Sequence, residues 1–210
     1  MKPHSHEDGL TLIELLIALV LTTFVSGATV ATFQSFSRNL TVQDNVIHMQ
    51  QNLRSGLYLM GREFRMAGYK GPNPASASTA GITNANIDNI TFSALAVDDG
   101  IDNDGDGETD ESGELTTIIY SHYDSNSDGR NDAIGRSTDG GPRSPVAENI
   151  QALQFYYEID TAGTITRSTA PVAMDNIRAV EITMLAEARR NARDYTNTSS
   201  YPTASGVTWG

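Results

Sequence analysis

The sequence predicts an α+β protein in which one long N-terminal α-helix packs on a C-terminal antiparallel β-sheet domain. Three observations lead to this fold class. The chain opens with a long apolar run, and no proline occurs between His4 and Gly71. Several apolar stretches of strand length follow. Most of the net charge of −12 is concentrated between those stretches, as expected for connections that project from a sheet.

The first element is a hydrophobic stretch from Leu10 to Phe33, in which Glu14 is the one charged residue. As a helix this stretch is about 36 Å long, enough to cross a hydrocarbon layer of roughly 30 Å. We therefore predict a transmembrane and assembly helix over residues 10–37. The alternative is a cleaved secretory signal that ends near Ser26-Gly27-Ala28. It is disfavoured because the leader is net acidic and the apolar run continues beyond that site.

Glu14 is the most informative residue of this stretch. A carboxylate within an apolar membrane segment costs roughly 2.5–3.5 kcal/mol on insertion scales, so it indicates a function and a partner by default. A buried negative charge recruits a buried positive one, and such a pair sets the register between subunits better than it adds stability. We therefore expect Glu14 to meet a cationic group.

The residues around Glu14 form the motif Gly9-Leu10-Thr11-Leu12-Ile13-Glu14-Leu15. This motif resembles the type IV prepilin signature. The resemblance implies cleavage after Gly9 by a membrane prepilin peptidase, which makes residues 1–9 a leader. It also implies N-methylation of Leu10, and pairing of Glu14 with the new α-amino group of a neighbouring subunit in a filament.

Residues 38–71 are predicted to continue the helix as an amphipathic segment, so that one helix runs from about Leu10 to Met66. Apolar side chains recur at spacings of three and four, which marks one helical face. They are Val42, Val46, Met49, Leu53, Leu57, Met60, Phe64 and Ala67. We interpret this face as core packing. The stretch Met49–Gly71 resembles the PilW-like minor pilins and the J-type pseudopilins of type II secretion, whose helix packs against a C-terminal sheet.

Residues 72–210 are predicted to form a β-rich, pilin-like domain. Four runs have the composition of strands: Ile87–Val97, Leu115–Tyr123, Ile150–Ile159 and Ile177–Leu185. Alternation of apolar residues between Leu153 and Ile159 predicts a sheet with one buried face. The stretch Pro145–Asp160 again resembles the PilW-like proteins.

An acidic insertion, residues 98–132, interrupts the predicted sheet. It holds twelve acidic residues and one arginine, a net charge of −11. Two strings in it match the first nine positions of an EF-hand-type calcium loop, with oxygen ligands at alternate positions and glycine at the sixth. The candidate ligands are Asp102, Asp104, Asp106, Glu108 and Asp110 in the first loop, and Asp124, Asn126, Asp128, Arg130 and Asp132 in the second. Glu108 and Arg130 would contribute only their backbone carbonyls.

The two loops predict a cofactor of about two calcium ions. The bidentate glutamate expected at position 12 is absent, because Gly113 and Gly135 stand there. Glu111 or Glu114 could complete the first loop. We therefore expect micromolar to millimolar affinity, as in extracellular modules. The alternative is a solvated, disordered acidic segment.

Composition excludes several functions. The absence of cysteine excludes disulfides, zinc–thiolate sites and cysteine nucleophiles. The net negative charge, with only two lysines, argues against nucleic acid as a partner. No catalytic fingerprint such as GxSxG, HExxH or a P-loop occurs, so we do not expect an enzyme.

The sequence therefore predicts a minor pilin that resembles the PilW-like family. It would reside in the bacterial inner membrane before assembly and then in a pilus at the cell surface, near the tip or in the assembly-initiating complex. The implied partners are other pilin subunits and the prepilin peptidase. Two alternatives stay open: a J-type pseudopilin of type II secretion, and a membrane-tethered, calcium-dependent adhesion module that does not polymerise.

Overall fold

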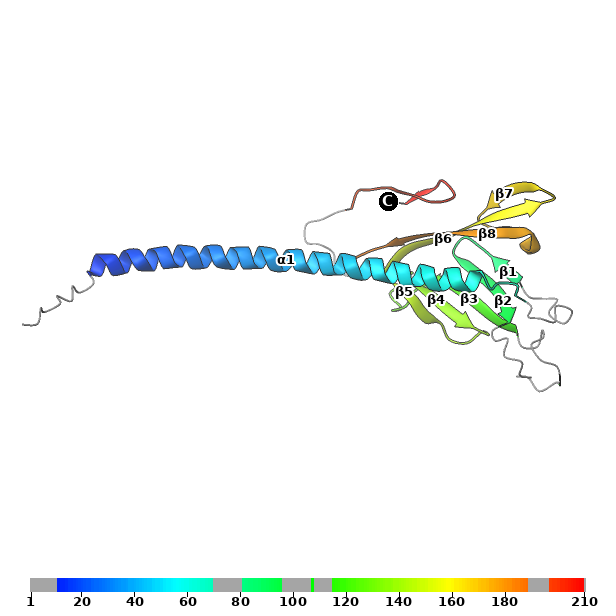
Figure 1. Cartoon of the computed structure of the whole chain (residues 1–210), viewed down its shortest axis with the longest axis horizontal. Helices are drawn as coiled ribbons and strands as arrows, with labels where there is room; N and C mark the ends of the chain where they lie inside the picture. The colour runs from blue at the N-terminus through cyan, green and yellow to red at the C-terminus, as the bar shows by residue number, and fades with distance from the viewer. Residues whose placement is uncertain (1–10, 70–80, 96–106, 108–114, 189–196, 210) are drawn as a thin grey trace, which may run out of the picture. The chain divides into compact units, whose positions relative to one another are not determined.

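The computed structural model describes residues 11–69, 81–95, 107, 115–188 and 197–209. The chain divides into two compact units, Met1–Asn45 and Val46–Gly210, which we describe separately. One helix, α1 (Leu12–Phe64), contributes to both (Figure 1). It is continuous across residues 37 and 38, where the sequence suggested a change from a membrane segment to an amphipathic one.

In the first unit, α1 presents apolar side chains to its surroundings on all sides. Leu12, Ile13 and Phe24 are 81%, 67% and 74% exposed within the subunit. The hydroxyl groups of Thr22, Thr23, Thr29, Thr32 and Thr41 each donate a hydrogen bond to the backbone carbonyl four residues earlier. These bonds satisfy the threonine hydroxyl groups within the helix itself, as a lipid environment requires. The helix is long and apolar enough to cross a membrane.

In the second unit, α1 ends two residues before the predicted Met66. Tighter turns follow, in which the Met66 N–H donates to the Glu63 carbonyl and the Ala67 N–H to the Phe64 carbonyl. Gly68 then adopts a φ of +80°, the left-handed conformation in which glycine commonly terminates helices. Its N–H donates to the Ser93 carbonyl at 3.0 Å, which ties the end of the helix to the sheet.

The larger sheet of the second unit has five antiparallel strands in sequential order, β1-β2-β3-β4-β5 (Figure 1). They are β1 (Gly81–Ala85), β2 (Asn89–Leu95), β3 (Leu115–Tyr123), β4 (Ala133–Thr138) and β5 (Ser144–Glu148). Pro145 lies in β5, an edge strand, where a missing N–H is tolerated.

The smaller sheet has three antiparallel strands in the order β7-β6-β8. They are β6 (Ile150–Thr161), β7 (Thr164–Ser168) and β8 (Ile177–Ala186), and the 3-10 turn η2 (Met174–Asn176) precedes β8. A two-stranded hairpin, β9 (Tyr201–Pro202) with β10 (Thr208–Trp209), contacts this sheet. Its Ser205 N–H donates to the Gln154 side-chain oxygen at 3.3 Å.

The five-stranded and the three-stranded sheet both contribute to one hydrophobic core beneath the end of α1. Phe64 packs edge-on against Phe92, Tyr120 and Phe155, with ring centroids 5.4–5.9 Å apart. The sheets also meet through the backbone, because the Phe155 N–H of β6 donates to the Ile87 carbonyl between β1 and β2. The helix therefore packs where the two sheets join.

The amphipathic face predicted for α1 is only partly correct. Leu53, Met60, Phe64 and Ala67 belong to the core or pack against it. In contrast, Leu57 is 42% exposed, and Val42 and Val46 are exposed as well. Gly56 occupies the buried position instead. A Cβ atom on Gly56 would lie 3.1 Å from the Ala147 Cβ, so β5 approaches the helix too closely for a leucine there.

The four predicted strand runs correspond to β2, β3, β6 and β8, and β3 has the predicted bounds. The predicted fold, a long helix packed on an antiparallel β-sheet domain, is confirmed, and the described residues of that domain form two sheets and a hairpin. Strands β1, β4, β5 and β7 were not predicted. They are short, and they carry polar residues, glycine or proline where a buried strand carries apolar ones.

Candidate functional site

Glu14 lies in the first turn of α1, next to the cap of that helix. The Thr11 N–H and hydroxyl both donate to Glu14 Oε2, at 2.9 and 2.7 Å. The Glu14 N–H in turn lies 3.4 Å from the Thr11 hydroxyl oxygen. This reciprocal arrangement is a capping box, in which threonine at the N-cap and glutamate three residues later satisfy each other's backbone N–H groups. The processing residues Gly9 and Leu10 lie outside the described residues.

Apart from Thr11, the described residues next to Glu14 in the helix are apolar and exposed. Its neighbours Leu12, Ile13 and Leu15 are 81%, 67% and 61% exposed. No described basic side chain forms an ion pair with it. The capping bonds engage Oε2, and Oε1 has no hydrogen bond to a described residue. The geometry leaves one carboxylate oxygen without a partner among the described residues and therefore available to a further cationic group.

The second acidic loop joins β3 to β4, and its backbone folds around Asp124. Asp124 Oδ1 accepts hydrogen bonds from the N–H groups of Asn126, Ser127 and Asp128, and Oδ2 accepts one from Gly129 at 2.7 Å. These bonds, that of Gly129 first, hold the pKa of Asp124 below its ordinary value. The loop backbone is thus arranged around a carboxylate that stays ionised.

Further side chains close the same loop. Asp132 accepts the Ser125 N–H at 2.8 Å through Oδ1 and the Asn126 side-chain amide at 3.0 Å through Oδ2. Asp128 Oδ1 accepts the Arg130 N–H at 2.9 Å. Ser127 and Gly129 both have a positive φ, of 65° and 88°, which allows the tight turn.

The carboxylates of this loop engage its backbone rather than converging on a common point. Among the described residues there is no group of three or more His, Cys, Asp or Glu side chains that could hold a metal ion. The candidate ligands of the first loop, Asp102, Asp104, Asp106, Glu108 and Asp110, lie outside the described residues.

The surroundings of Gly135, at position 12 of the second loop, leave no room for the glutamate that would complete a calcium loop. Gly135 lies within β4 and is buried beneath the Tyr123 ring. A Cβ atom there would approach Tyr123 Cε1 to 2.6 Å, and the Arg143 guanidinium lies 5.8 Å from the centre of the same ring. Any larger side chain would displace the ring. The second loop is therefore a nine-residue hairpin connection.

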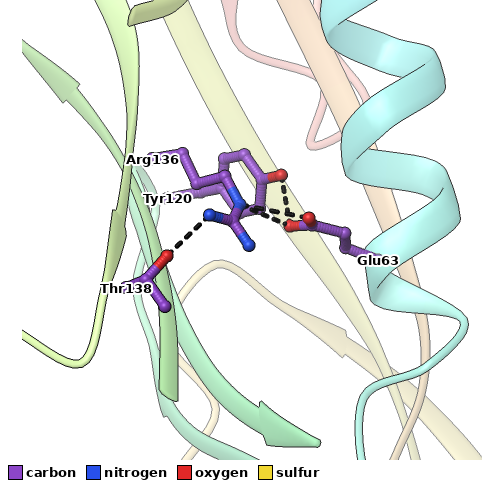
Figure 2. A network of polar contacts seen from close by, with 4 residues as sticks. All are labelled: Glu63, Tyr120, Arg136 and Thr138. Atoms are coloured by element: carbon purple, nitrogen blue, oxygen red, sulfur yellow. Dashed lines mark hydrogen bonds and ion pairs between the residues drawn. The ribbon is translucent and has the colours of Figure 1, made fainter. Parts of the chain in front are cut away.

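A second polar cluster joins the C-terminal part of α1 to the larger sheet (Figure 2). Glu63 Oε2 accepts hydrogen bonds from the Tyr120 hydroxyl at 2.6 Å and from Arg136 Nε at 3.0 Å. Arg136 also donates to the Thr138 hydroxyl at 2.6 Å. The side chains of Glu63 and Arg136 are only 17% and 28% exposed, so solvent screens their attraction weakly.

Burial changes the ionisation of this cluster. Burial first, and then the nearby Glu63 carboxylate, raise the pKa of Tyr120 well above its ordinary value. The hydrogen bond to Glu63 raises the pKa of Arg136, which is already charged at all relevant pH values. The cluster is therefore a fixed, ionised connection between helix and sheet.

Comparison with known proteins supports the N-terminal assignment. The prokaryotic N-terminal methylation motif matches residues 4–30, which include the capping box and Glu14. The chain carries the signal of a type IV pilin-like protein. Proteins with this motif are structural subunits of pilin or pseudopilin type rather than enzymes. No curated protein and no solved structure matches the chain.

The sequence predicts the role of Glu14, but it did not reveal the part of Thr11 in the cap or the separate cluster around Glu63. Thr11 was not recognised, although a threonine followed three residues later by glutamate is the signal of a capping box. The cluster of Glu63, Tyr120 and Arg136 carried no sequence signal, because its members are 57 and 73 residues apart.

Proposed function

We propose that this pilin-like protein is a minor pilin, anchored in the bacterial inner membrane by α1 and then assembled into a filament. The observation that carries the proposal is the matched methylation motif on an uninterrupted helix whose large apolar side chains between Leu12 and Phe36 are exposed. Apolar side chains exposed on all sides of a helix need lipid before assembly and sister helices after it. Cleavage after Gly9 and methylation of Leu10 would convert the first state to the second.

Glu14 would pair with the methylated amino terminus of a neighbouring subunit. In hydrocarbon an unpaired carboxylate is costly, whereas a pair with a cation removes most of that penalty. The capping bonds from Thr11 hold the carboxylate near the start of the helix, where a neighbouring terminus would meet it. The pair would set the stagger between subunits.

The second unit would face outward, near the tip or in the assembly-initiating complex. The PilW-like stretches of the sequence support this role. The same motif is shared by pilins and pseudopilins, so a secretion pseudopilus is the alternative location. Deleting the pilus assembly ATPase and, separately, that of type II secretion distinguishes the two, because only one deletion would abolish incorporation.

The filament role is tested by shearing filaments from cells that carry Glu14 variants. We expect Glu14→Ala to be absent from sheared filaments while the protein accumulates in the membrane. Glu14→Gln should also fail, because glutamine preserves the capping box but not the charge. Glu181→Ala, an exposed glutamate of β8, is the matched control and should incorporate normally. Absence of the wild type from filaments would favour the non-polymerising adhesion module.

We also propose that calcium stabilises the acidic region. Eleven net negative charges within 35 residues repel one another. Because the chain has no cysteine, no disulfide can hold this region together, and a bound cation would stabilise it instead. About two ions would cancel four of those charges. The sequence of the second loop supports the second site, since its glycine and alternating oxygens match the first nine positions of a calcium loop, and a bound ion would have to turn inward the carboxylates that now accept bonds from the loop backbone.

Calorimetric titration with calcium, together with thermal melting, tests this proposal. We expect binding in the micromolar to millimolar range and a rise in melting temperature. Asp128→Asn should weaken the effect, because it removes a charged ligand but retains the oxygen that accepts the Arg130 N–H. Asp175→Asn removes the same charge outside the loops and is the control. No heat and no shift in melting would reject calcium binding.

A further inference from the structure

The second unit leaves one face of α1 uncovered. Six residues at spacings of three and four lie along it, and we call them the outer stripe: Arg54, Leu57, Tyr58, Gly61, Arg62 and Arg65. These spacings place the six side chains on one helical face. The residues that enter the core, such as Gly56, Met60 and Phe64, lie on the opposite face. The outer stripe has the periodicity of a contact seam, and its residues Arg54, Leu57, Tyr58, Arg62 and Arg65 are exposed.

The three arginines of the outer stripe have no partner among the described residues. Arg136, Arg167 and Arg178, in contrast, each form an ion pair with a carboxylate of the same subunit. Three exposed guanidinium groups on a single helical face, without a carboxylate partner among the described residues, leave that face able to bind carboxylates.

Between the arginines lie apolar and small residues suited to close contact. Leu57 and Tyr58 are 42% and 69% exposed, and both border a shallow hollow of about 550 Å³ with Leu53. A Cβ atom on Gly61 would meet nothing within 4 Å. Glycine within a helix costs about 1 kcal/mol relative to alanine, so packing inside the subunit does not account for it. Close approach of a second backbone would.

We propose that the outer stripe is the docking surface for an acidic face of the neighbouring subunit in the filament. Tyr58 and Leu57 would pack at the centre of the contact and the arginines would pair with carboxylates around it, the usual arrangement of an apolar centre with a charged rim. A polyanion such as nucleic acid is disfavoured as the occupant, because the whole chain carries −12. The proposal rests on the filament role and adds to it a second, charge-selective contact beyond Glu14.

Zero-length carbodiimide cross-linking tests the contact in intact filaments. This reagent joins an amine to a carboxylate only where the two are in contact, and the chain has just two lysines, Lys2 and Lys70. Arg62→Lys in a Lys70→Arg background therefore places a single side-chain amine on the outer stripe once residues 1–9 are removed. Arg167→Lys in the same background is the positive control, since Arg167 lies 3.2 Å from Glu158 of its own subunit.

We expect mass spectrometry to map an amide between position 62 and an aspartate or glutamate of another filament subunit. The control should give only the cross-link to Glu158 within one chain. Absence of a cross-link at position 62, or one confined to the same chain, overturns the proposal while the control succeeds. Binding of filaments to DNA or anionic vesicles through these arginines, without such a cross-link, overturns it too.

Charge reversal separates this proposal from the filament role itself. The triple change of Arg54, Arg62 and Arg65 to glutamate should lower incorporation into sheared filaments at least about tenfold, because attraction becomes repulsion. The same three positions changed to lysine should incorporate like the wild type. Normal incorporation of the glutamate triple variant overturns the outer stripe alone, whereas absence of the wild type from filaments overturns the filament role as well.

Discussion

Two glutamates of α1 have different partners within the subunit. Glu63 accepts hydrogen bonds from Tyr120 and Arg136, whereas Glu14 is bonded only to Thr11 of its own helix turn. Glu63 lies in a largely buried cluster, where a carboxylate needs a partner, and the fold supplies one. The fold supplies Glu14 with none but Thr11 among the described residues, as the proposed pairing of Glu14 with a neighbouring subunit requires.

Removing the Glu63 carboxylate should destabilise the second unit more than removing one of its donors. Glu63→Ala leaves the Arg136 charge and the Tyr120 hydroxyl without their partner, and we expect a loss of about 3 kcal/mol. Tyr120→Phe removes one hydrogen bond to a charged group, and we expect about 1.5 kcal/mol. Urea unfolding of a soluble fragment that begins at Val46 measures both. Equal losses would contradict a network centred on Glu63.

Alkaline titration should reveal two tyrosines that do not ionise in the folded protein. Burial, and then the Glu63 carboxylate, raise the pKa of Tyr120, while burial, and then the Asp88 charge, raise that of Tyr157. A raised pKa stabilises the fold fully below the unfolded value of about 10, and this stabilisation is lost as the pH rises above it.

Absorbance at alkaline pH measures this directly. Of the eight tyrosines, Tyr120 and Tyr157 should ionise only together with unfolding, above about pH 10. Tyr120→Phe should reduce that late, cooperative step by one tyrosine. Smooth titration of all eight while the sheet remains folded would show that these hydroxyls are accessible.

At the scale of elements, two glycines of α1 should respond oppositely to alanine. A Cβ on Gly61 meets nothing within 4 Å, so Gly61→Ala should stabilise the free subunit by about 1 kcal/mol through helix propensity. A Cβ on Gly56 would lie 3.1 Å from that of Ala147, so Gly56→Ala should gain less or lose stability. Thermal melting of the two variants compares them, and equal gains would show that β5 does not crowd the helix.

The elements that sequence predicts well are those with a strong hydrophobic pattern. The long helix and the strands β2, β3, β6 and β8 combine length with apolar residues. Strands β4 and β5 were not predicted, because glycine and proline are uncommon within strands. In the structure the Tyr123 ring covers Gly135 of β4, and Pro145 lies in β5 at the edge of the sheet. Leu57 was assigned to the core because its spacing fits the apolar face of the helix. In the structure Gly56 takes the buried position instead, because Ala147 of β5 lies close to the helix there.

The candidate site was predictable to the extent that it is local. Glu14 stands out because a carboxylate in an apolar run is visible in the sequence itself. The residues of the outer stripe are also close in sequence, but only the structure shows that the sheets leave this face of α1 exposed. The periodicity of apolar residues assigned Leu57 to the buried face together with Met60 and Phe64, whereas Leu57 is exposed.

At the scale of the whole molecule, the charge is distributed unevenly along the chain. Residues 98–132 carry −11, residues 15–37 carry no charge, and the arginines of the outer stripe have no partner among the described residues. In the proposed filament, an apolar helix and charged faces of opposite sign would suit contacts between different faces of successive subunits, which build open filaments rather than closed dimers.

The central claim is that the chain matures into a filament subunit, and the mature N-terminus tests it most directly. Mass spectrometry of the protein from sheared filaments should find an N-terminal peptide that begins at Leu10 and carries one added methyl group. A chain that retains Met1–Gly9, or one cut near Ser26-Gly27-Ala28 and released from the membrane, would contradict the account.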